Sequence, residues 1–160
     1  MGDYALTELN HVEVMKGIEF FKNFSRPDLE IISPISYIKE FKVGDILIKQ
    51  NTKNGTIYFN LSGEVDVFID EGFVMCFNDS GHVFGEMSFV NQTVASATVM
   101  AKSDARFLCI NIEEIYKLDK SYHISLQRSI YQSCAELLAN KLRATNELAK
   151  HYMNNQKKAS

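Results

Sequence analysis

Short apolar segments separated by turn residues fill the middle of the chain. Between residues 35 and 110, β-forming side chains alternate with polar ones, most clearly over residues 65–69. Glycine-containing turns recur at intervals of about 8 to 12 residues, which is typical of a β-sandwich or barrel. Asp70-Glu71-Gly72 has the composition of a tight hairpin tip. The pattern therefore predicts a many-stranded β-domain whose last two strands lie at 95–100 and 105–110.

A helical pattern precedes this region, and residues 1–34 are interpreted as an N-terminal helical segment. Within it, Ser25 has the composition of a helix N-cap, with Pro27 in the first turn and Asp28 completing a capping box. The chain enters the β-region directly after this short helix. The sequence thus predicts helices packed at the start of a β-domain.

A second helical pattern follows the β-region. Residues 111–153 carry apolar side chains at helical spacing, and no glycine or proline occurs after Lys117. We expect a short helix, then a long one, and a frayed tail over residues 154–160. The fold class is therefore α+β, mainly β.

The long helix is predicted to form a homodimer. A helix of this length cannot bury its whole apolar stripe on one side of a small β-domain, so a second copy is the natural partner. The expected dimer contacts are Ile130, Cys134, Leu137, Leu138, Leu142 and Leu148. Since few residues follow this helix, no DNA-binding helix-turn-helix is expected, and a signal would leave through contacts with a partner protein.

Composition narrows the remaining possibilities. The 160 residues suffice for one domain with its own core. No apolar run approaches the roughly 20 residues needed to span a bilayer, and the first residues lack the basic and apolar pattern of a signal peptide, so we expect a cytoplasmic protein without membrane contact. Cys76, Cys109 and Cys134 lie far apart in apolar stretches and are predicted to be buried free thiols.

Charge is distributed unevenly along the chain. The segment from Lys120 onward carries +5, although the net charge of the chain is −3. A basic helix is compatible with nucleic acid or an acidic partner, but a solvated helix face is the commoner explanation.

Residues 84–99 carry the candidate chemistry. Gly85 permits a close backbone approach, and a short helix starting at Glu86 would direct free N–H groups outward, as in anion sites. The Glu86 carboxylate is placed to accept hydrogen bonds from a sugar hydroxyl. A strand-to-helix turn without any ligand explains the Gly-Glu pair equally well.

These residues resemble a known family. Phe84-Gly85-Glu86-Met87-Ser88-Phe89 and Ala95-Ser96-Ala97-Thr98-Val99 resemble the phosphate-binding cassette of cyclic nucleotide-binding domains, as found in catabolite-activator-type regulators, cyclic-AMP-dependent kinase regulatory subunits and nucleotide-gated channels. Residues 41–48 and 58–67 resemble strands of the same family, and 137–148 its dimerising helix in bacterial members. The resemblance implies an eight-stranded antiparallel β-roll, or jelly roll, with N-terminal helices and a long C-terminal helix.

The candidate ligand-binding residues follow from this resemblance: Phe84, Gly85, Glu86, Met87, Ser88, Ala95, Ser96 and Ala97. Glu86 would bind a ribose hydroxyl, or else brace the turn. Ser88 and Ser96 would donate to a phosphate, or simply be satisfied within the pocket. No cofactor is expected apart from a possible cyclic nucleotide.

One departure from the family pattern bears directly on ligand binding. The cassette arginine that pairs with the cyclic phosphate is replaced by Ala95, and alanine cannot supply a charge-assisted hydrogen bond. The nearest basic residue in sequence is Lys102, at the far end of the strand. The loop 51–55, which comes before the tyrosine-containing hairpin in the family pattern, also differs from the family sequence.

Catalytic and metal sites find little support. His82 and Glu86 have the H-x3-E spacing of half a cupin site, but further histidines at matching spacing are lacking. No nucleophile–base or paired-carboxylate arrangement stands out. We therefore expect no enzyme, no catalytic residues and no metal. Two functions stay open: a regulatory domain with reduced or lost binding of cyclic AMP and cyclic GMP, and a true sensor that binds a cyclic nucleotide or another small anion in a non-consensus way.

Overall fold

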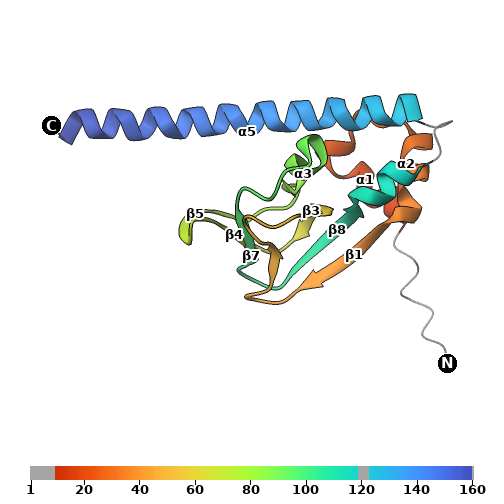
Figure 1. Cartoon of the computed structure of the whole chain (residues 1–160), viewed down its shortest axis with the longest axis horizontal. Coiled ribbons are helices and arrows are strands. Elements are labelled where there is room, and N and C mark those ends of the chain that lie inside the picture. The colour runs from red at the N-terminus through yellow and green to blue at the C-terminus, as the bar shows by residue number, and fades with distance from the viewer. Residues whose placement is uncertain (1–9, 119–122, 160) are drawn as a thin grey trace.

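A β-roll covered on one side by helices forms the body of the protein (Figure 1). The computed structural model describes residues 10–118 and 123–159; residues 1–9 of the predicted N-terminal segment and Lys120 of the basic segment lie outside this range. One sheet has the strand order β1-β8-β3-β6 and the other β2-β7-β4-β5, and neighbouring strands are antiparallel. The strands are β1 (Ser36–Phe41), β2 (Ile46–Ile48), β3 (Thr56–Ser62), β4 (Val65–Ile69), β5 (Gly72–Phe77), β6 (Val83–Phe84), β7 (Thr98–Ala101) and β8 (Ala105–Asn111). The predicted fold class is confirmed.

Two local predictions, one of a turn and one of the start of a strand, can be compared with the structure. Asp70 and Glu71 both have positive φ, of 50° and 64°, which matches the right-handed twist of the β4–β5 hairpin. The strand expected from residue 95 begins instead at Thr98. The backbone of Ala95 bonds to the 51–52 loop, donating to the Thr52 carbonyl and accepting from the Asn51 N–H, so Ala95 pairs with a loop before β7 begins.

The N-terminal segment consists of short helical pieces instead of one continuous helix. They are α1 (His11–Lys16), a 3-10 turn (Glu19–Phe21), α2 (Arg26–Ile32) and a second 3-10 turn (Ser33–Ile35). The capping box at α2 is confirmed, since the Ser25 hydroxyl accepts from the Asp28 N–H and the Asp28 carboxylate accepts from the Ser25 N–H. Phe20, Phe21 and Phe59 join these pieces to the roll through ring contacts of 4.8–5.3 Å.

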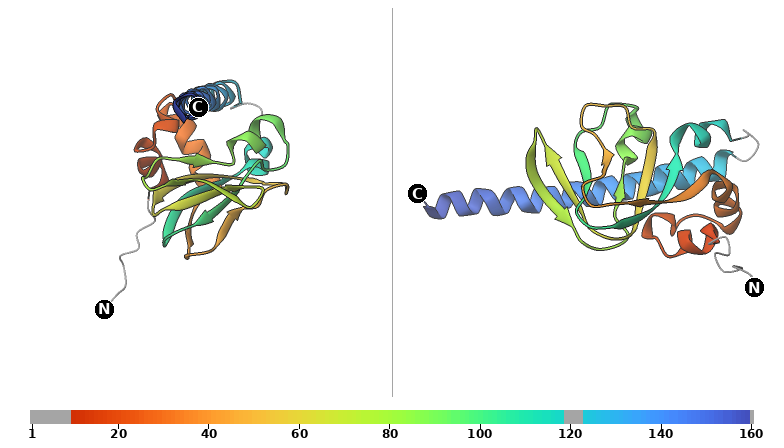
Figure 2. Two further views of the ribbon diagram at one scale, coloured as in Figure 1. Left: turned by 90° about the vertical axis from the view of Figure 1, so that its left-hand side faces the viewer. Right: turned by 90° about the horizontal axis from the view of Figure 1, so that it is seen from below.

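The helix α5 (His123–Ala159) follows the short α4 (Ile112–Lys117) and is the longest element. It runs over the N-terminal helices and then past α3 (Glu86–Asn91), and it projects beyond the roll (Figures 1 and 2). The helix continues to Ala159, whereas the sequence analysis places its end at residue 153. Before this extension, Glu147 and Lys150 pair along the helix at 2.8 Å.

The predicted dimer contacts differ in how far the protomer itself covers them. Ile130 and Cys134 are buried within the protomer, at 4% and 1% exposure, and Leu137 packs against the same core. Because the N-terminal helices and the roll already cover Ile130 and Cys134, the assignment of these two residues to a dimer contact is wrong. Leu137 and Leu138 are only half-buried, and their assignment stays a prediction. Leu142 and Leu148 remain exposed, at 61% and 47%.

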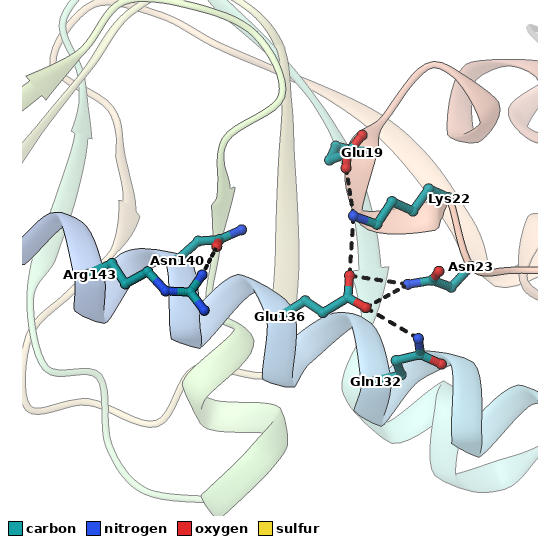
Figure 3. A network of polar contacts seen from close by, with 7 residues as sticks. All are labelled: Glu19, Lys22, Asn23, Gln132, Glu136, Asn140 and Arg143. Atoms are coloured by element: carbon teal, nitrogen blue, oxygen red, sulfur yellow. Dashed lines mark hydrogen bonds and ion pairs between the residues drawn. The ribbon is translucent and has the colours of Figure 1, made fainter.

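A polar network fastens α5 to the N-terminal helices (Figure 3). The Glu136 carboxylate accepts hydrogen bonds from Gln132 and Asn23 and lies 3.2 Å from the Lys22 ammonium. These contacts lower the pKa of Glu136, with the Gln132 hydrogen bond and then the Lys22 contact as the main causes. Lys22 also binds Glu19 at 2.8 Å, so α5 is tied to the segment preceding α2.

The three cysteines differ in environment. Cys109 and Cys134 are buried, and burial raises the pKa of each thiol to about 12. Cys76, predicted to be buried, is only half-buried on β5, and its Sγ lies 3.5 Å from the Lys102 ammonium. Lys102 in turn pairs with Glu64 at 3.7 Å.

We therefore expect one cysteine of the native protein to react with a thiol-specific disulfide reagent near pH 8. The thiolate is the reactive form, and two of the three thiols stay protonated and shielded until unfolding. Titration with the reagent should give one fast-reacting thiol in buffer and three in denaturant. The variant Cys76→Ser should give none in buffer; two or more fast thiols in the native wild type would contradict the burial of Cys109 and Cys134.

Candidate ligand pocket

A cavity of about 380 Å³ lies between the roll and α5. All eight predicted ligand-binding residues line it, although their part in binding a ligand stays a prediction. Its walls are mainly apolar and come from both sheets, the α3 segment and α5. The lining residues are Ile48, Asn54, Val67, Met75, Phe77, Phe84, Gly85, Glu86, Met87, Ser88, Ala95, Ser96, Ala97, Val99, Lys141, Ala144, Thr145 and Leu148.

Gly85 sets the geometry at the start of α3. Its φ of 88° is in the left-handed region that favours glycine. An added Cβ would also collide with the carbonyl oxygen of Thr56 and lie 2.6 Å from the Asn54 amide nitrogen. The Asn54 side chain is itself fixed by donating to the Thr56 carbonyl. Glycine is therefore required both for the turn and for its contact with β3.

Glu86 begins α3 and is only 3% exposed. Its carboxylate accepts a hydrogen bond of 2.7 Å from the ammonium of Lys141 on α5, and this nitrogen also donates to the Val83 carbonyl at 2.9 Å. The ammonium lies 5.8 Å from the centre of the Phe84 ring. A buried carboxylate without a partner would be costly, so this ion pair makes the buried position of Glu86 tolerable.

Lys141 was not among the predicted site residues. Cys134, Lys141 and Leu148 follow one another at seven-residue intervals and thus share a helix face. The position of Lys141 within an apolar stripe could have identified it as a site residue, but the sequence analysis interpreted that stripe as a dimer contact. The carboxylate that it meets is separated from it by 55 positions in the sequence.

The sequence model for one protein family, the cyclic nucleotide-binding domain, matches residues 38–122. The chain belongs to this family. A cyclic-AMP-dependent protein kinase regulatory subunit from Debaryomyces hansenii is 31% identical over 109 residues, which make up 65% of this chain and 24% of the relative. The chain thus spans about a quarter of that relative's length.

Solved structures share the fold of this cyclic nucleotide-binding domain. A cyclic nucleotide-binding domain from Methylobacillus flagellatus superposes with a TM-score of 0.72 at 19% identity, over 86% of this chain and 79% of the other. The regulatory subunit of a cAMP-independent protein kinase A from Trypanosoma brucei gives 0.67 at 20% identity, over 91% and 48%. At these identities the likeness concerns the fold alone.

Ala95, which the sequence analysis places at the position of the cassette arginine, belongs to the segment that precedes β7. Its side chain is 8% exposed and lines the cavity. Lys102, the nearest basic residue in sequence, contacts Cys76 and Glu64 and does not line the cavity. Within residues 10–118 and 123–159, the positive charge among the cavity-lining residues comes from Lys141 alone.

The two serines of the cassette lie differently. Ser88 is 7% exposed, whereas Ser96 is exposed and its hydroxyl lies 4.0 Å from the Met87 sulfur. Both line the cavity. Among the described residues, neither hydroxyl has a charged partner, and their part in holding a phosphate stays a prediction.

The cupin-like spacing of His82 and Glu86 does not bring them together. His82 lies 2.7 Å from Asp79 and packs on the Phe77 ring, while Glu86 faces Lys141. Across the described residues, no three His, Cys, Asp or Glu side chains group as metal ligands would. The helices of the described part of the chain are also too short or too polar to cross a membrane.

The role of Gly85 gives a stability prediction with a matched control. Gly85→Ala and Gly81→Ala both place a Cβ at positive φ, 88° and 93°, which costs roughly 1–2 kcal/mol. Nothing lies within 4 Å of a Cβ at Gly81, whereas Gly85 meets the β3 backbone. Urea denaturation should therefore show a clearly larger loss for Gly85→Ala. Equal losses would mean that β3 does not constrain the cassette.

Proposed function

We propose that this cyclic nucleotide-binding domain is a non-enzymatic regulatory module with reduced or lost binding of cyclic AMP and cyclic GMP, and that the position of α5 is its output to a partner protein. One observation carries the proposal: Lys141 of α5 binds the buried Glu86 carboxylate. The resemblance to the family adds the expectation that Ala95, which lines the same cavity, stands in place of the cassette arginine. The carboxylate that would receive a ribose hydroxyl is thus already paired with the helix.

Several features support regulation over catalysis. The domain is related to kinase regulatory subunits, and its cavity holds a single carboxylate–ammonium pair instead of a nucleophile–base pair. A cyclic phosphate in this cavity would lack the bidentate partner that an arginine at 95 gives. The same fold occurs in a protein named as a cAMP-independent kinase subunit, which supports a domain of this fold without a response to cyclic AMP.

The second candidate function, a sensor of a non-consensus ligand, is favoured by the cavity itself. Its volume of about 380 Å³ lies within the usual range of ligand pockets, about 300–1,000 Å³. Location in the cytoplasm stays a prediction from the sequence.

Cyclic AMP should stabilise the variant Ala95→Arg clearly more than the wild type. Arginine at 95 would supply the missing fork of donors at the cavity wall, and a ligand present at about 100 times its Kd adds about 2.7 kcal/mol of stability. Thermal unfolding with millimolar cyclic AMP or cyclic GMP measures this. Asn154→Arg, which adds the same charge at an exposed position of α5 away from the cavity, is the matched control. Wild-type protein that binds cyclic AMP as tightly as Ala95→Arg would refute the proposed loss of affinity.

We also propose a homodimer through the part of α5 that projects beyond the roll. Leu142, Ala149 and Met153 repeat at intervals of seven and four residues and so share one exposed side of this helix. This side differs from the face of Lys141 and Leu148, which lines the cavity. A second copy carrying the same repeat would cover it by coiled-coil packing.

Sedimentation velocity should therefore show a species of about twice the 18.2 kDa chain mass. The double variant Leu142→Glu with Met153→Glu should sediment as a monomer, because it places charges in the contact. Lys150→Glu changes the net charge by the same amount and should stay dimeric. A monomeric wild type at high micromolar concentration would exclude this dimer.

A further inference from the structure

We infer that Lys141 is the anion-binding residue of the cavity, which makes the ligand class a small organic anion with an apolar body, bound against α5. The inference rests on the proposed function, in which the position of α5 reports the state of this cavity. It assigns to the C-terminal helix the charge that the roll does not supply at Ala95.

The charges around the cavity support this assignment. Among the lining residues of the described chain, Glu86 carries the negative charge and Lys141 the positive one. The two neutralise each other, so the lining of the cavity has no net charge. A monoanion would leave the site with one net negative charge, the same total as a carboxylate, an arginine and a monoanion would give. Lys141 therefore supplies the positive charge that an arginine at position 95 would otherwise provide.

The donors of Lys141 leave room for a ligand. An ammonium group has three N–H donors, and two of them are directed to the Glu86 carboxylate and the Val83 carbonyl. No third acceptor for this nitrogen occurs among the described residues. One donor is therefore available to an anion without separation of the Glu86–Lys141 pair, and the side chain is still 40% exposed.

The other walls determine the body of the ligand. Val67, Met75, Phe77 and Val99 come from the strands opposite α5 and offer only apolar side chains to the cavity. Such a surface suits an aromatic ring or a nucleobase and would not pair a second charge. The ligand is thus expected to place its anionic group toward the helix and its apolar part toward the sheet.

This arrangement would couple binding to the helix directly. Thr145 and Leu148 on the next turns of α5 also line the cavity, so a ligand held by Lys141 contacts one continuous helix face. An arginine at 95 would instead hold the anion on the roll. In this protein, release of α5 from the roll would also remove the cation from the site.

Calorimetric titration with two matched pairs of probes tests the inference: cyclic AMP against adenosine, and 2-naphthoate against 2-naphthamide. Each pair differs in the anionic group, and the two arms separate a phosphodiester from a carboxylate. We expect at least one anion to bind the wild type more tightly than its neutral partner. Lys141→Met should weaken that anion by about tenfold or more, because it removes a charge-assisted hydrogen bond.

Three variants keep the result interpretable. Lys150→Met removes a lysine from the exposed side of the same helix and should not change anion binding. Lys141→Arg keeps the charge and should retain it. Glu86→Gln combined with Lys141→Met avoids an unpaired buried carboxylate, so a folded protein without anion binding can be obtained if Lys141→Met alone is unstable.

Absence of anion binding by the wild type, or equal binding by Lys141→Met, would overturn the inference. These outcomes are distinct from failure of the proposed function. That proposal fails only if the wild type binds cyclic AMP as tightly as Ala95→Arg does. If Ala95→Arg gains cyclic AMP while the wild type binds no probe, the proposed loss of affinity stands and Lys141 serves only to neutralise Glu86.

Discussion

A carboxylate buried at 3% exposure needs a counter-charge, and in this protein the counter-charge comes from another part of the chain. Glu86 is fixed at the start of α3 by the turn at Gly85, which is held in turn by the β3 backbone. Lys141 can reach it only if α5 lies across the cassette. The position of the helix, the neutrality of the cavity and the shape of its outer wall therefore all depend on this one ion pair.

A second set of contacts holds the same helix further towards its N-terminus. Ile130 and Cys134 are buried in the core shared with the N-terminal helices, and Glu136 binds Asn23 and Lys22 at the edge of that core. The two attachments differ in character. The attachment to the N-terminal helices is a packed apolar core with a polar edge, whereas the attachment to the cassette is a charged contact beside the cavity. Their unequal strength would let the helix detach from the cassette while it stays attached to the N-terminal helices.

Local signals in the sequence predicted much of the fold. Two such features are the capping box of Ser25 and Asp28 and the hairpin tip at Asp70 and Glu71. They depend only on neighbouring residues, so they can be predicted from the sequence. The resemblance to the family located the residues that surround the cavity. The β-strand expected from Ala95 started later, because its backbone pairs with a loop that lies more than 40 positions away.

Contacts between elements far apart in the chain could not be predicted from local sequence signals. Helical spacing shows that Ile130, Cys134 and Leu148 share a face, but it does not show what that face meets. A second copy and the chain's own roll are equally good apolar partners for such a stripe. Only the three-dimensional arrangement reveals that the roll and the N-terminal helices take most of it, and that Lys141 within it meets a carboxylate.

The length of α5 turns small displacements into large ones. From Glu136 to the end of the helix at Ala159 the axis extends by about 35 Å, at roughly 1.5 Å per residue. If the helix pivots at the Glu136 contacts, a tilt of about 10° moves its far end by about 6 Å, more than a full helical turn. The helix would thus act as a lever, with its fulcrum on the N-terminal helices, its load at the projecting end and the cassette between them.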